Sequence, residues 1–313
     1  MRDIDELEGA FDHSGGPRMR DPHCDDRLAA QGYCVLRVMS REDAIAEGGA
    51  LASLLPQDLT ESQPGSNWHH SFMDPDTTRA KTIARHLARR ITPLLQNEIL
   101  DGRCAITALA VKPAGAAGTP LHQHYPSSAA PFARRIAAWL SLSDASPEAR
   151  TFRLAPYTQR LAPYIRTHGS GDFFDGYTDR IEAEYCTDIL VEPGEAVFFE
   201  DSILHATGPN DASTPNPSHR VNAIATFLGK DMPSARWRSV GEGEGRFEVE
   251  EFAGCREFGE FAQQDDPIPS KRRTYEVNFR NHALDFETFA RCIARRKADD
   301  LRNRQIRAGG GLR

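Results

Sequence analysis

Long hydrophobic runs are missing from this sequence. Its longest apolar stretches, Ile136–Leu142 and Ile106–Val111, fall far short of the roughly 18 apolar residues that a membrane-spanning helix needs. The first residues alternate acidic with apolar side chains and resemble neither a secretory signal nor a transit peptide. We therefore expect a cytoplasmic protein that does not enter a membrane.

Cysteine motifs and an excess of basic charge are missing as well. The six cysteines are scattered and form no C-x-x-C pair, so reduced and mostly structural thiols are expected. The 38 basic and 45 acidic side chains give a net charge of −7. This balance disfavours a nucleic-acid partner, because domains that bind nucleic acid are usually basic. A small-molecule substrate suits the chain better, and the sequence leaves the oligomeric state open.

The middle of the chain is a series of short segments typical of strands. They are rich in Val, Ile, Leu and Phe, they are separated by Gly and Pro turns, and no regular helices alternate with them. This pattern predicts an antiparallel sandwich or barrel rather than a parallel sheet with crossover helices. The eight expected strands cover residues 104–112, 119–124, 135–143, 151–155, 188–192, 196–199, 203–206 and 219–228.

Helices are expected before this series. Ser40 can cap a helix over about 41–55, which follows a short strand at 33–38. Apolar side chains spaced four apart over 83–99 predict a second helix, which Pro93 should kink or divide. The residues up to about 23 are expected to be loosely held.

The C-terminal part is predicted to contain a strand and a final helix. The strand covers about 274–279 and the helix about 285–303, and the apolar side of the helix carries Phe286, Phe289, Ile293 and Leu301.

We interpret the chain as a single domain over residues 1–313. Residues 1–103 would form an N-terminal helical support with a short strand, 104–230 the β core, and 231–313 a C-terminal extension.

An insertion at 156–187 interrupts the strand pattern. An aromatic-rich segment between barrel strands is often a lid or a wall of the substrate pocket, and in that case Phe173 and Phe174 would face the substrate. The alternative is local packing, with the insertion forming a small core of its own. The aromatic side chains are Tyr157, Tyr164, Phe173, Phe174, Tyr177 and Tyr185.

Three histidines form the most informative pattern. His122 and His124 are two residues apart at the end of a predicted strand, so their side chains would point to the same face. His205, from a neighbouring strand, can close a triangle around one metal ion and leave further coordination positions open. Neutral imidazole suits iron, copper and zinc. The alternative is a set of hydrogen-bonded core histidines.

The surroundings of these histidines resemble a known family. Six short motifs follow one another: V-K-P at 111–113, P-L-H-Q at 120–123, A-W-L-S-L at 138–142, P-G-E-A-V-F-F at 193–199, H-A-T-G-P-N at 205–210 and H-R-V at 219–221. The series is similar to the phytanoyl-CoA dioxygenase-like branch of the non-haem Fe(II)/2-oxoglutarate oxygenases over roughly residues 30–230.

This resemblance implies a fold and a set of cofactors. The fold would be mainly β with flanking helices, a double-stranded β-helix, which is a jelly roll or cupin-like barrel. The activity would be oxidation of a small organic metabolite with Fe(II), 2-oxoglutarate as cosubstrate and O2. His122 and His205 match the two ligand histidines of the family, Arg220 matches the arginine that binds 2-oxoglutarate, and Lys112 matches a lysine that reaches the same cosubstrate.

One departure from the family concerns the third ligand. The family has H-x-D where this chain has His122-x-His124, and the four residues after His124 offer no carboxylate. Replacing Asp by neutral His raises the net charge of an iron site by one unit. Three outcomes are open: His124 ligates the metal, or it stands aside while water or an anion fills the position, or oxygenase activity has been lost.

Two other functions are kept open. Cupin thiol dioxygenases use three-histidine iron without 2-oxoglutarate, although their glutamate after H-x-H is missing here, where Ser128 and Ala129 stand. A catalytically degenerate barrel that binds a small ligand is the other. Arg220 distinguishes these functions, because a guanidinium suits the bidentate binding of a dicarboxylate.

Further polar and aromatic residues are candidates for the surroundings of the site. Gln123 and Trp139 are candidates for the substrate pocket, although Trp139 is more typical of a core position. The acids Glu200 and Asp201 precede His205 and either can supply a carboxylate near the metal. His69 and His70 are expected to be exposed or to cap a helix.

Overall fold

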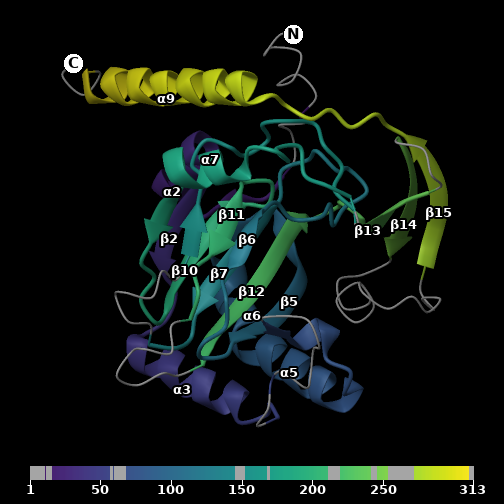
Figure 1. Cartoon of the computed structure of the whole chain (residues 1–313). Helices are drawn as coiled ribbons and strands as arrows, with labels where there is room; N and C mark the ends of the chain where they lie inside the picture. Colours follow the sequence, from purple (N-terminus) through teal and green to yellow (C-terminus); the bar gives the residue numbers. More distant parts are fainter. Residues whose placement is uncertain are drawn as a thin grey trace.

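Two antiparallel sheets face each other in the middle of the molecule (Figure 1). The structure is a computed structural model that describes residues 11, 16–56, 59, 68–144, 152–167, 170–210, 219–240, 245–252 and 271–309. The larger sheet has the strand order β2 (Tyr33–Arg37), β10 (Glu195–Glu200), β7 (Ile136–Ser141), β12 (Arg220–Gly229), β5 (Gly102–Lys112), β3 (His69–His70). The smaller has the order β6 (Thr119–His122), β11 (His205–Thr207), β8 (Phe152–Leu154), β9 (Thr187–Ile189).

This arrangement is the double-stranded β-helix that the sequence predicts. All eight predicted strands of the core are present, and the short strand before them is β2. Their alternation places one set of side chains between the two sheets and the other set outside. On β7, Ala137 and Trp139 point into the space between the sheets, while Ile136, Ala138 and Leu140 belong to the outer cluster.

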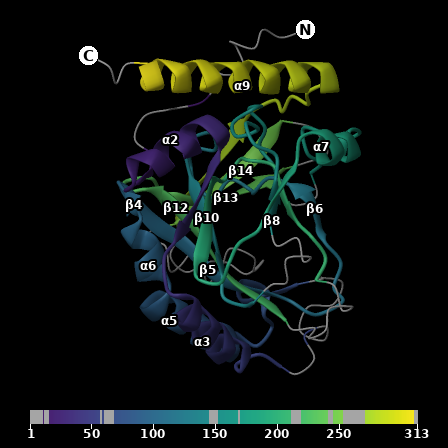
Figure 2. The ribbon, with the colours of Figure 1, turned by 90° about the vertical axis from the view of Figure 1, so that its left-hand side faces the viewer.

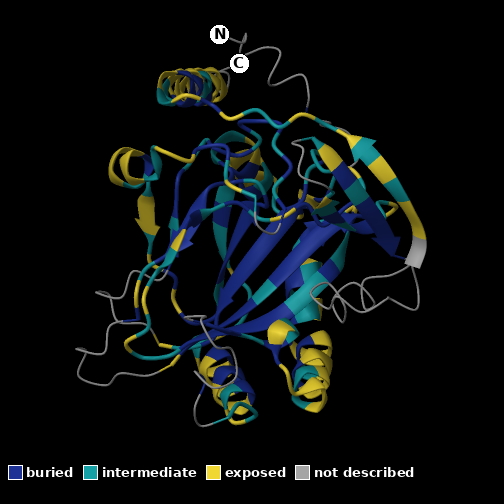
Figure 3. Cartoon of the chain, turned by 45° about the vertical axis from the view of Figure 1, so that its right-hand side comes forward, coloured by how far each residue is buried: buried dark blue, intermediate teal, exposed yellow. Residues whose placement is uncertain are grey.

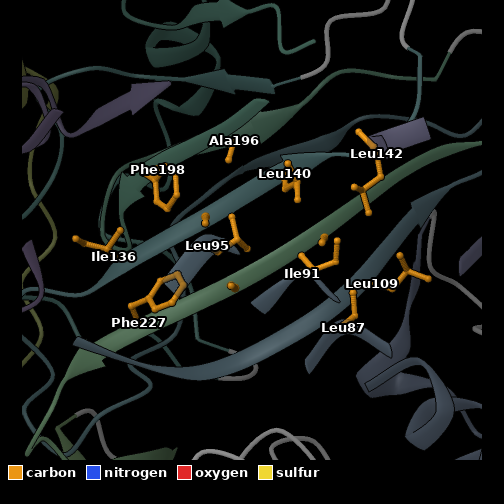
Figure 4. Packing of buried hydrophobic residues seen from close by; sticks show 14 of the residues in the cluster. Leu87, Ile91, Leu95, Leu109, Ile136, Leu140, Leu142, Ala196, Phe198 and Phe227 are labelled. Carbon is orange, nitrogen blue, oxygen red and sulfur yellow. The ribbon is translucent and has the colours of Figure 1, made fainter. Parts of the chain in front are cut away.

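Helices cover the outer face of the six-stranded sheet. Figure 4 shows Leu87, Ile91 and Leu95 packed against the sheet residues, and all three are fully buried. The predicted division at Pro93 is confirmed, because one helix ends at Arg90 and the next begins at Thr92. The helices of this part are α2 (Pro22–Gln31), α3 (Arg41–Ala52), η1 (Ser71–Met73), α5 (Thr77–Arg90) and α6 (Thr92–Asn97).

Residues 18–23 differ from the expectation of a loosely held segment up to about 23, because Arg18 and Met19 pair with Leu100 and Ile99 and helix α2 begins at Pro22. Of the rest of that segment, residues 1–10 and 12–15 lie outside the described residues. Asp21 accepts a hydrogen bond from the backbone N–H of His23, Pro22 occupies the first turn, and Gly32 ends the helix at a φ of 87°. These are ordinary start and stop signals of a helix. Cys24 and Leu28 on α2 are buried, and the five described cysteines are free thiols, as expected.

The remaining elements lie at the edges of the core. Two short strands, β1 (Arg18–Met19) and β4 (Ile99–Leu100), pair with each other in antiparallel orientation. The C-terminal part forms a three-stranded antiparallel sheet, and the long helix α9 lies across one end of the molecule (Figures 1 and 2). The bounds are β13 (Ser234–Ser239), β14 (Arg246–Phe252), β15 (Lys271–Asn278), α7 (Thr178–Glu184) and α9 (Phe286–Gly309).

The aromatic insertion packs against α9. Tyr177 and Tyr185 make edge-on contacts with Phe289, at ring-centroid distances of 5.9 and 5.3 Å. Phe173 and Phe174 are 1% exposed and belong to the same hydrophobic cluster as Phe289. The structure therefore shows the packing role of the insertion, a small core shared with α9.

Polar contacts strengthen this junction. Arg296 on α9 donates hydrogen bonds to the backbone oxygens of Tyr157 and Arg160 at 3.0 and 3.1 Å. One expectation for α9 is wrong: Leu301 is 60% exposed and lies off the apolar side. Figure 3 shows mostly buried residues in the sheets and a mixture of exposed, intermediate and buried residues on this helix, which is seen nearly along its axis. None of the helices in the described parts of the chain is long and apolar enough to cross a membrane.

The shared core predicts that two apolar residues of α9 contribute very differently to stability. Phe289→Ala should lower the free energy of unfolding by about 3–5 kcal/mol, because it empties a buried aromatic position. Leu301→Ala on the exposed side should change it by less than about 0.5 kcal/mol. Urea denaturation of the two variants measures both values. Equal changes in the free energy of unfolding would mean that packing of α9 on the insertion does not stabilise the protein.

Candidate metal centre

Two strands of the smaller sheet bring the predicted ligands together. His122 ends β6 and His205 begins β11, and the two residues are direct partners in the antiparallel register. Their ring centroids are 4.3 Å apart. His124 follows two residues after His122, and its ring centroid lies 4.6 Å from that of His205.

These three residues fit a metal ion. One ligand nitrogen of each lies within 4.8 Å of the others, and they form the only such group of histidine, cysteine and acidic side chains among the described residues. The Nε2 atoms of His124 and His205 are 3.1 Å apart. Three imidazole nitrogens around one point are a common donor set for iron, zinc and copper.

The backbone sets the tautomer of two of these histidines. Nδ1 of His122 donates a hydrogen bond to the carbonyl of Pro120 at 2.8 Å, and Nδ1 of His205 donates to that of Ile203 at 3.0 Å. A carbonyl oxygen can only accept, so each Nε2 keeps its lone pair for a metal.

The same two imidazoles are held in their neutral form. Desolvation by the surrounding protein, followed by the nearby His124, lowers the pKa of His122 to about 3. Desolvation, followed by His122, also lowers the pKa of His205 well below its usual range. Neutral imidazole is the form that binds metals.

A carboxylate lies behind the third histidine rather than beside the metal position. Oδ1 of Asp201 accepts a hydrogen bond from Nδ1 of His124, and Oδ2 accepts one from Nε of Arg135 at 2.8 Å. Burial opposes ionisation of Asp201, but His124 and Arg135 outweigh it and hold its pKa at about 2. Glu200, the neighbouring acid, pairs instead with Arg160 at 2.8 Å.

Aromatic rings form the inner wall of the centre. Phe152 stacks on His205 at a centroid distance of 5.7 Å, and Phe199 lies 4.9 Å from the same ring. Trp139 contacts Phe152 at 5.4 Å and is 4% exposed, so it belongs to the core behind this wall.

Two buried cations lie together at one end of the β5 and β12 pair. Arg220 is the direct strand partner of Lys112, 108 positions away in the sequence. Nζ of Lys112 donates to Oγ1 of Thr207 at 3.1 Å and to the backbone oxygen of Gly208 at 2.9 Å. Arg220 donates to the same oxygen at 3.0 Å. Thr207 lies two residues after His205, so β11 connects the cations to the histidines.

Burial makes the charged forms of Lys112 and Arg220 energetically unfavourable. Burial, followed by the neighbouring Arg220, lowers the pKa of Lys112 to about 6, and burial lowers the pKa of Arg220 to about 10. The ring of Trp68 lies 4.3 Å from Nζ of Lys112. No acidic side chain among the described residues pairs with Lys112. An anion bound here would relieve the repulsion between the two cations.

Other predicted residues lie in different surroundings. Gln123 is buried, and its backbone oxygen accepts a hydrogen bond from Arg166 at 2.7 Å. Phe173 and Phe174 lie in the cluster shared with α9. The expectation for His69 is wrong, whereas His70 is half-buried and stands at the N-cap position of η1, without a side-chain capping hydrogen bond.

These two histidines form strand β3. His69 is 0% exposed, and its Nε2 lies 3.4 Å from Asp74. His70 is stacked 5.2 Å from the ring of Phe72. Pairing of β3 with β5 at the edge of the larger sheet accompanies the burial of His69 and leaves His70 half-buried.

Two arginines lie near the centre. Arg135, which directly precedes β7, holds Asp201, and the sequence alternation predicts it on the same face as Trp139. Arg166 comes from the insertion, and its guanidinium lies 4.7 Å over the half-exposed ring of Tyr125, next to His124. Nothing local in the sequence marks Arg166 as a neighbour of the histidines.

Comparison with solved structures supports the fold. The non-heme alpha ketoglutarate dependent epimerase SnoN from nogalamycin biosynthesis is 15% identical, with a TM-score of 0.50 over 80% of this chain and 94% of that one. EvdO2 from Micromonospora carbonacea var. aurantiaca, complexed with 2-oxoglutarate, is 16% identical, with a TM-score of 0.49 over 71% of this chain and 95% of that one. At 15% identity the likeness to SnoN shows the fold alone.

The sequence itself supplies the family. No curated protein matches the chain at a significant level. Residues 28–215 match the family model described as phytanoyl-CoA dioxygenase (PhyH), and this range covers His122, His124 and His205 together with every strand of the two core sheets except β12. With more than half of its length matched, the chain belongs to the phytanoyl-CoA dioxygenase family.

Proposed function

We propose that the protein is an Fe(II)- and 2-oxoglutarate-dependent oxygenase that hydroxylates or otherwise oxidises a small organic metabolite. The observation that carries this proposal is the pair of buried cations, Lys112 and Arg220, joined through β11 to the three-histidine cluster. A metal site without a dicarboxylate cosubstrate has no need of two buried charges of the same sign at this place.

The three histidines would hold the iron. Bound iron would supply oxygen activation, with 2-oxoglutarate as the reductant that is decarboxylated to succinate. His122 and His205 keep their Nε2 lone pairs directed away from their backbone acceptors, and Phe152 and Phe199 fix the ring of His205. The protein thus contributes orientation and a wall that excludes water on that side.

Lys112 and Arg220 would bind the far carboxylate of the cosubstrate. The guanidinium offers parallel N–H donors, and the ammonium adds a charge within the same enclosed space. The hydrogen bonds to Thr207 and Gly208 fix both cations before any ligand arrives. Such preorganisation reduces the entropy lost on binding.

The substrate would approach from the side of His124. Its side chain is 34% exposed, and Tyr125 beside it is 46% exposed, whereas His205 is 4% exposed. Arg166 from the insertion lies over Tyr125 and limits this side. These features support a small organic substrate and not a particular molecule.

Two alternatives remain, and one experiment separates them from the proposal. They are a three-histidine dioxygenase that does not use 2-oxoglutarate, and a barrel that only binds a ligand. Anaerobic titration with Fe(II) and 2-oxoglutarate should give a visible charge-transfer band, and admitting air should then give succinate. Iron binding with no response to 2-oxoglutarate would support the first alternative. Failure to bind iron would support the second.

The cation pair predicts a selective effect of one substitution. Arg220→Met should raise the dissociation constant for 2-oxoglutarate about 100-fold, because the far carboxylate would lose a desolvated charged partner. Binding of Co(II), measured by visible absorption, should stay within about twofold of the unaltered protein. The control is Arg153→Met, which removes an arginine from β8 that pairs with Asp188 at the surface. Unchanged 2-oxoglutarate affinity in Arg220→Met would contradict the assigned role.

The lowered pKa of Lys112 predicts that cosubstrate binding takes up a proton. With a pKa of about 6 in the free protein, the amine is mostly neutral at pH 8. A bound carboxylate raises the pKa of Lys112. The affinity for 2-oxoglutarate is therefore greatest below about pH 6 and is lost as the pH rises through the pKa that Lys112 has in the complex. The dissociation constant should rise up to about tenfold per pH unit in that window. Calorimetry in buffers of different ionisation enthalpy measures the proton uptake, which Lys112→Met should abolish.

A further inference from the structure

Three residues from three separate segments form one connected chain behind the candidate metal centre. His124 follows β6, Asp201 follows β10, and Arg135 precedes β7. The carboxylate of Asp201 joins the other two side chains, accepting from Nδ1 of His124 with one oxygen and from Nε of Arg135 with the other. Asp201 is 2% exposed and Arg135 is 5% exposed.

Backbone hydrogen bonds join the same residues. The N–H of His124 donates to the carbonyl of Asp201 at 3.3 Å, and the N–H of Asp201 donates to the carbonyl of Arg135 at 3.1 Å. Arg135 is held in turn, because its Nη1 donates to the carbonyl of Pro131 at 2.7 Å. Each side-chain contact is therefore supported by a main-chain contact between the same two residues, which leaves Asp201 little freedom to turn.

The geometry points to Asp201 as the positioning residue that makes His124 a metal ligand. This inference rests on the three-histidine site proposed above and concerns its third position. A carboxylate can only accept, so Nδ1 of His124 must carry a proton, and in the neutral ring Nε2 then keeps the lone pair. The Nε2 atom of His124 lies 3.1 Å from that of His205, on the side where the metal would bind. The carboxylate that the family places on the metal is thus replaced here by a histidine with a carboxylate behind it.

Arg135 makes this arrangement selective for aspartate. Its Nε–H needs an acceptor at the near oxygen of residue 201. In Asp201→Asn the amide oxygen would turn toward Arg135, and the amide N–H groups would face His124. His124 would then accept at Nδ1 and carry its proton on Nε2, the tautomer that cannot ligate. The substitution changes one atom and leaves the volume of the side chain unchanged.

The first test measures the tautomer without any metal. Nitrogen-15 NMR of the histidine rings in the metal-free protein should show His124 protonated on Nδ1, and in Asp201→Asn protonated on Nε2. His124 protonated on Nε2 in the unaltered protein would overturn the inference, even if no variant folds. The control is Glu200→Gln, which alters the adjacent buried acid that pairs with Arg160 and should leave the His124 tautomer as it was.

The second test measures Co(II) binding by visible absorption and compares the effect of Asp201→Asn in two proteins, the unaltered one and the His124→Asp variant. Asp201→Asn should weaken Co(II) binding about 10- to 100-fold in the unaltered protein. In a His124→Asp background residue 124 ligates through oxygen and has no tautomer, so Asp201→Asn should then cost less than about twofold. Equal losses in both backgrounds would show a merely structural role, and no loss in either would show that His124 is not a ligand.

These outcomes are independent of the cosubstrate. Co(II) binding and the ring tautomer need neither 2-oxoglutarate nor turnover. A protein that shows the expected tautomer and the expected pattern of Co(II) affinities, but no response to 2-oxoglutarate, would retain this inference and lose the proposed oxygenase function. The reverse result, succinate formation with no effect of Asp201→Asn, would retain the function and remove the role of Asp201.

Discussion

The antiparallel pairing of β6 with β11 is the constraint on which the candidate site depends. It places His122 directly opposite His205, at a distance that neither strand could set alone. Because a shift of one residue in the register would turn one of the two rings to the other face of the sheet, the site needs this register and no other. The bulge between His205 and Thr207 then allows β11 to reach Lys112 further along.

Burial has opposite consequences for the two halves of the site. Around the histidines it favours the neutral form, which a metal requires, so the cost of desolvation falls on a state the site does not use. Around Lys112 and Arg220 it opposes the charged form that would bind an anion. Lys112 is therefore mostly neutral in the free protein at pH 8, and a bound carboxylate would favour its charged form.

The parts outside the barrel support it from two sides. Helices α3, α5 and α6 lie on the outer face of the larger sheet and bury its apolar residues. Helix α9 packs on the aromatic insertion, and its Arg296 binds backbone oxygens of that segment. The insertion thus has a structural role, and its Arg166 lies over Tyr125 beside His124.

Local patterns were sufficient for the eight core strands and for most of the helices. Short segments rich in Val, Ile, Leu and Phe between turn residues indicated the strands, and the division between α5 and α6 followed from Pro93. The expectations did not include α2, α7, β3, β13 or β14, although Asp21, Pro22 and Gly32 are ordinary start and stop signals for α2. Spacing indicated His122, His124 and His205, and the resemblance to the family indicated Lys112 and Arg220.

Contacts between distant segments were decided by the tertiary structure alone. The sequence marks Glu200 and Asp201 alike as acids near His205, and nothing near them specifies which of the two contacts His124, 77 positions before Asp201. The partner is set by where β10 ends relative to β6 and β7, which depends on the packing of two sheets. The same holds for His69, which pairing at a sheet edge turned from an expected surface residue into a buried one. The sequence by itself determined which residues are able to bind a metal, because that is a property of their chemistry and spacing; only the tertiary structure decided which carboxylate stands behind which histidine, because hydrogen bonds form between neighbours in space.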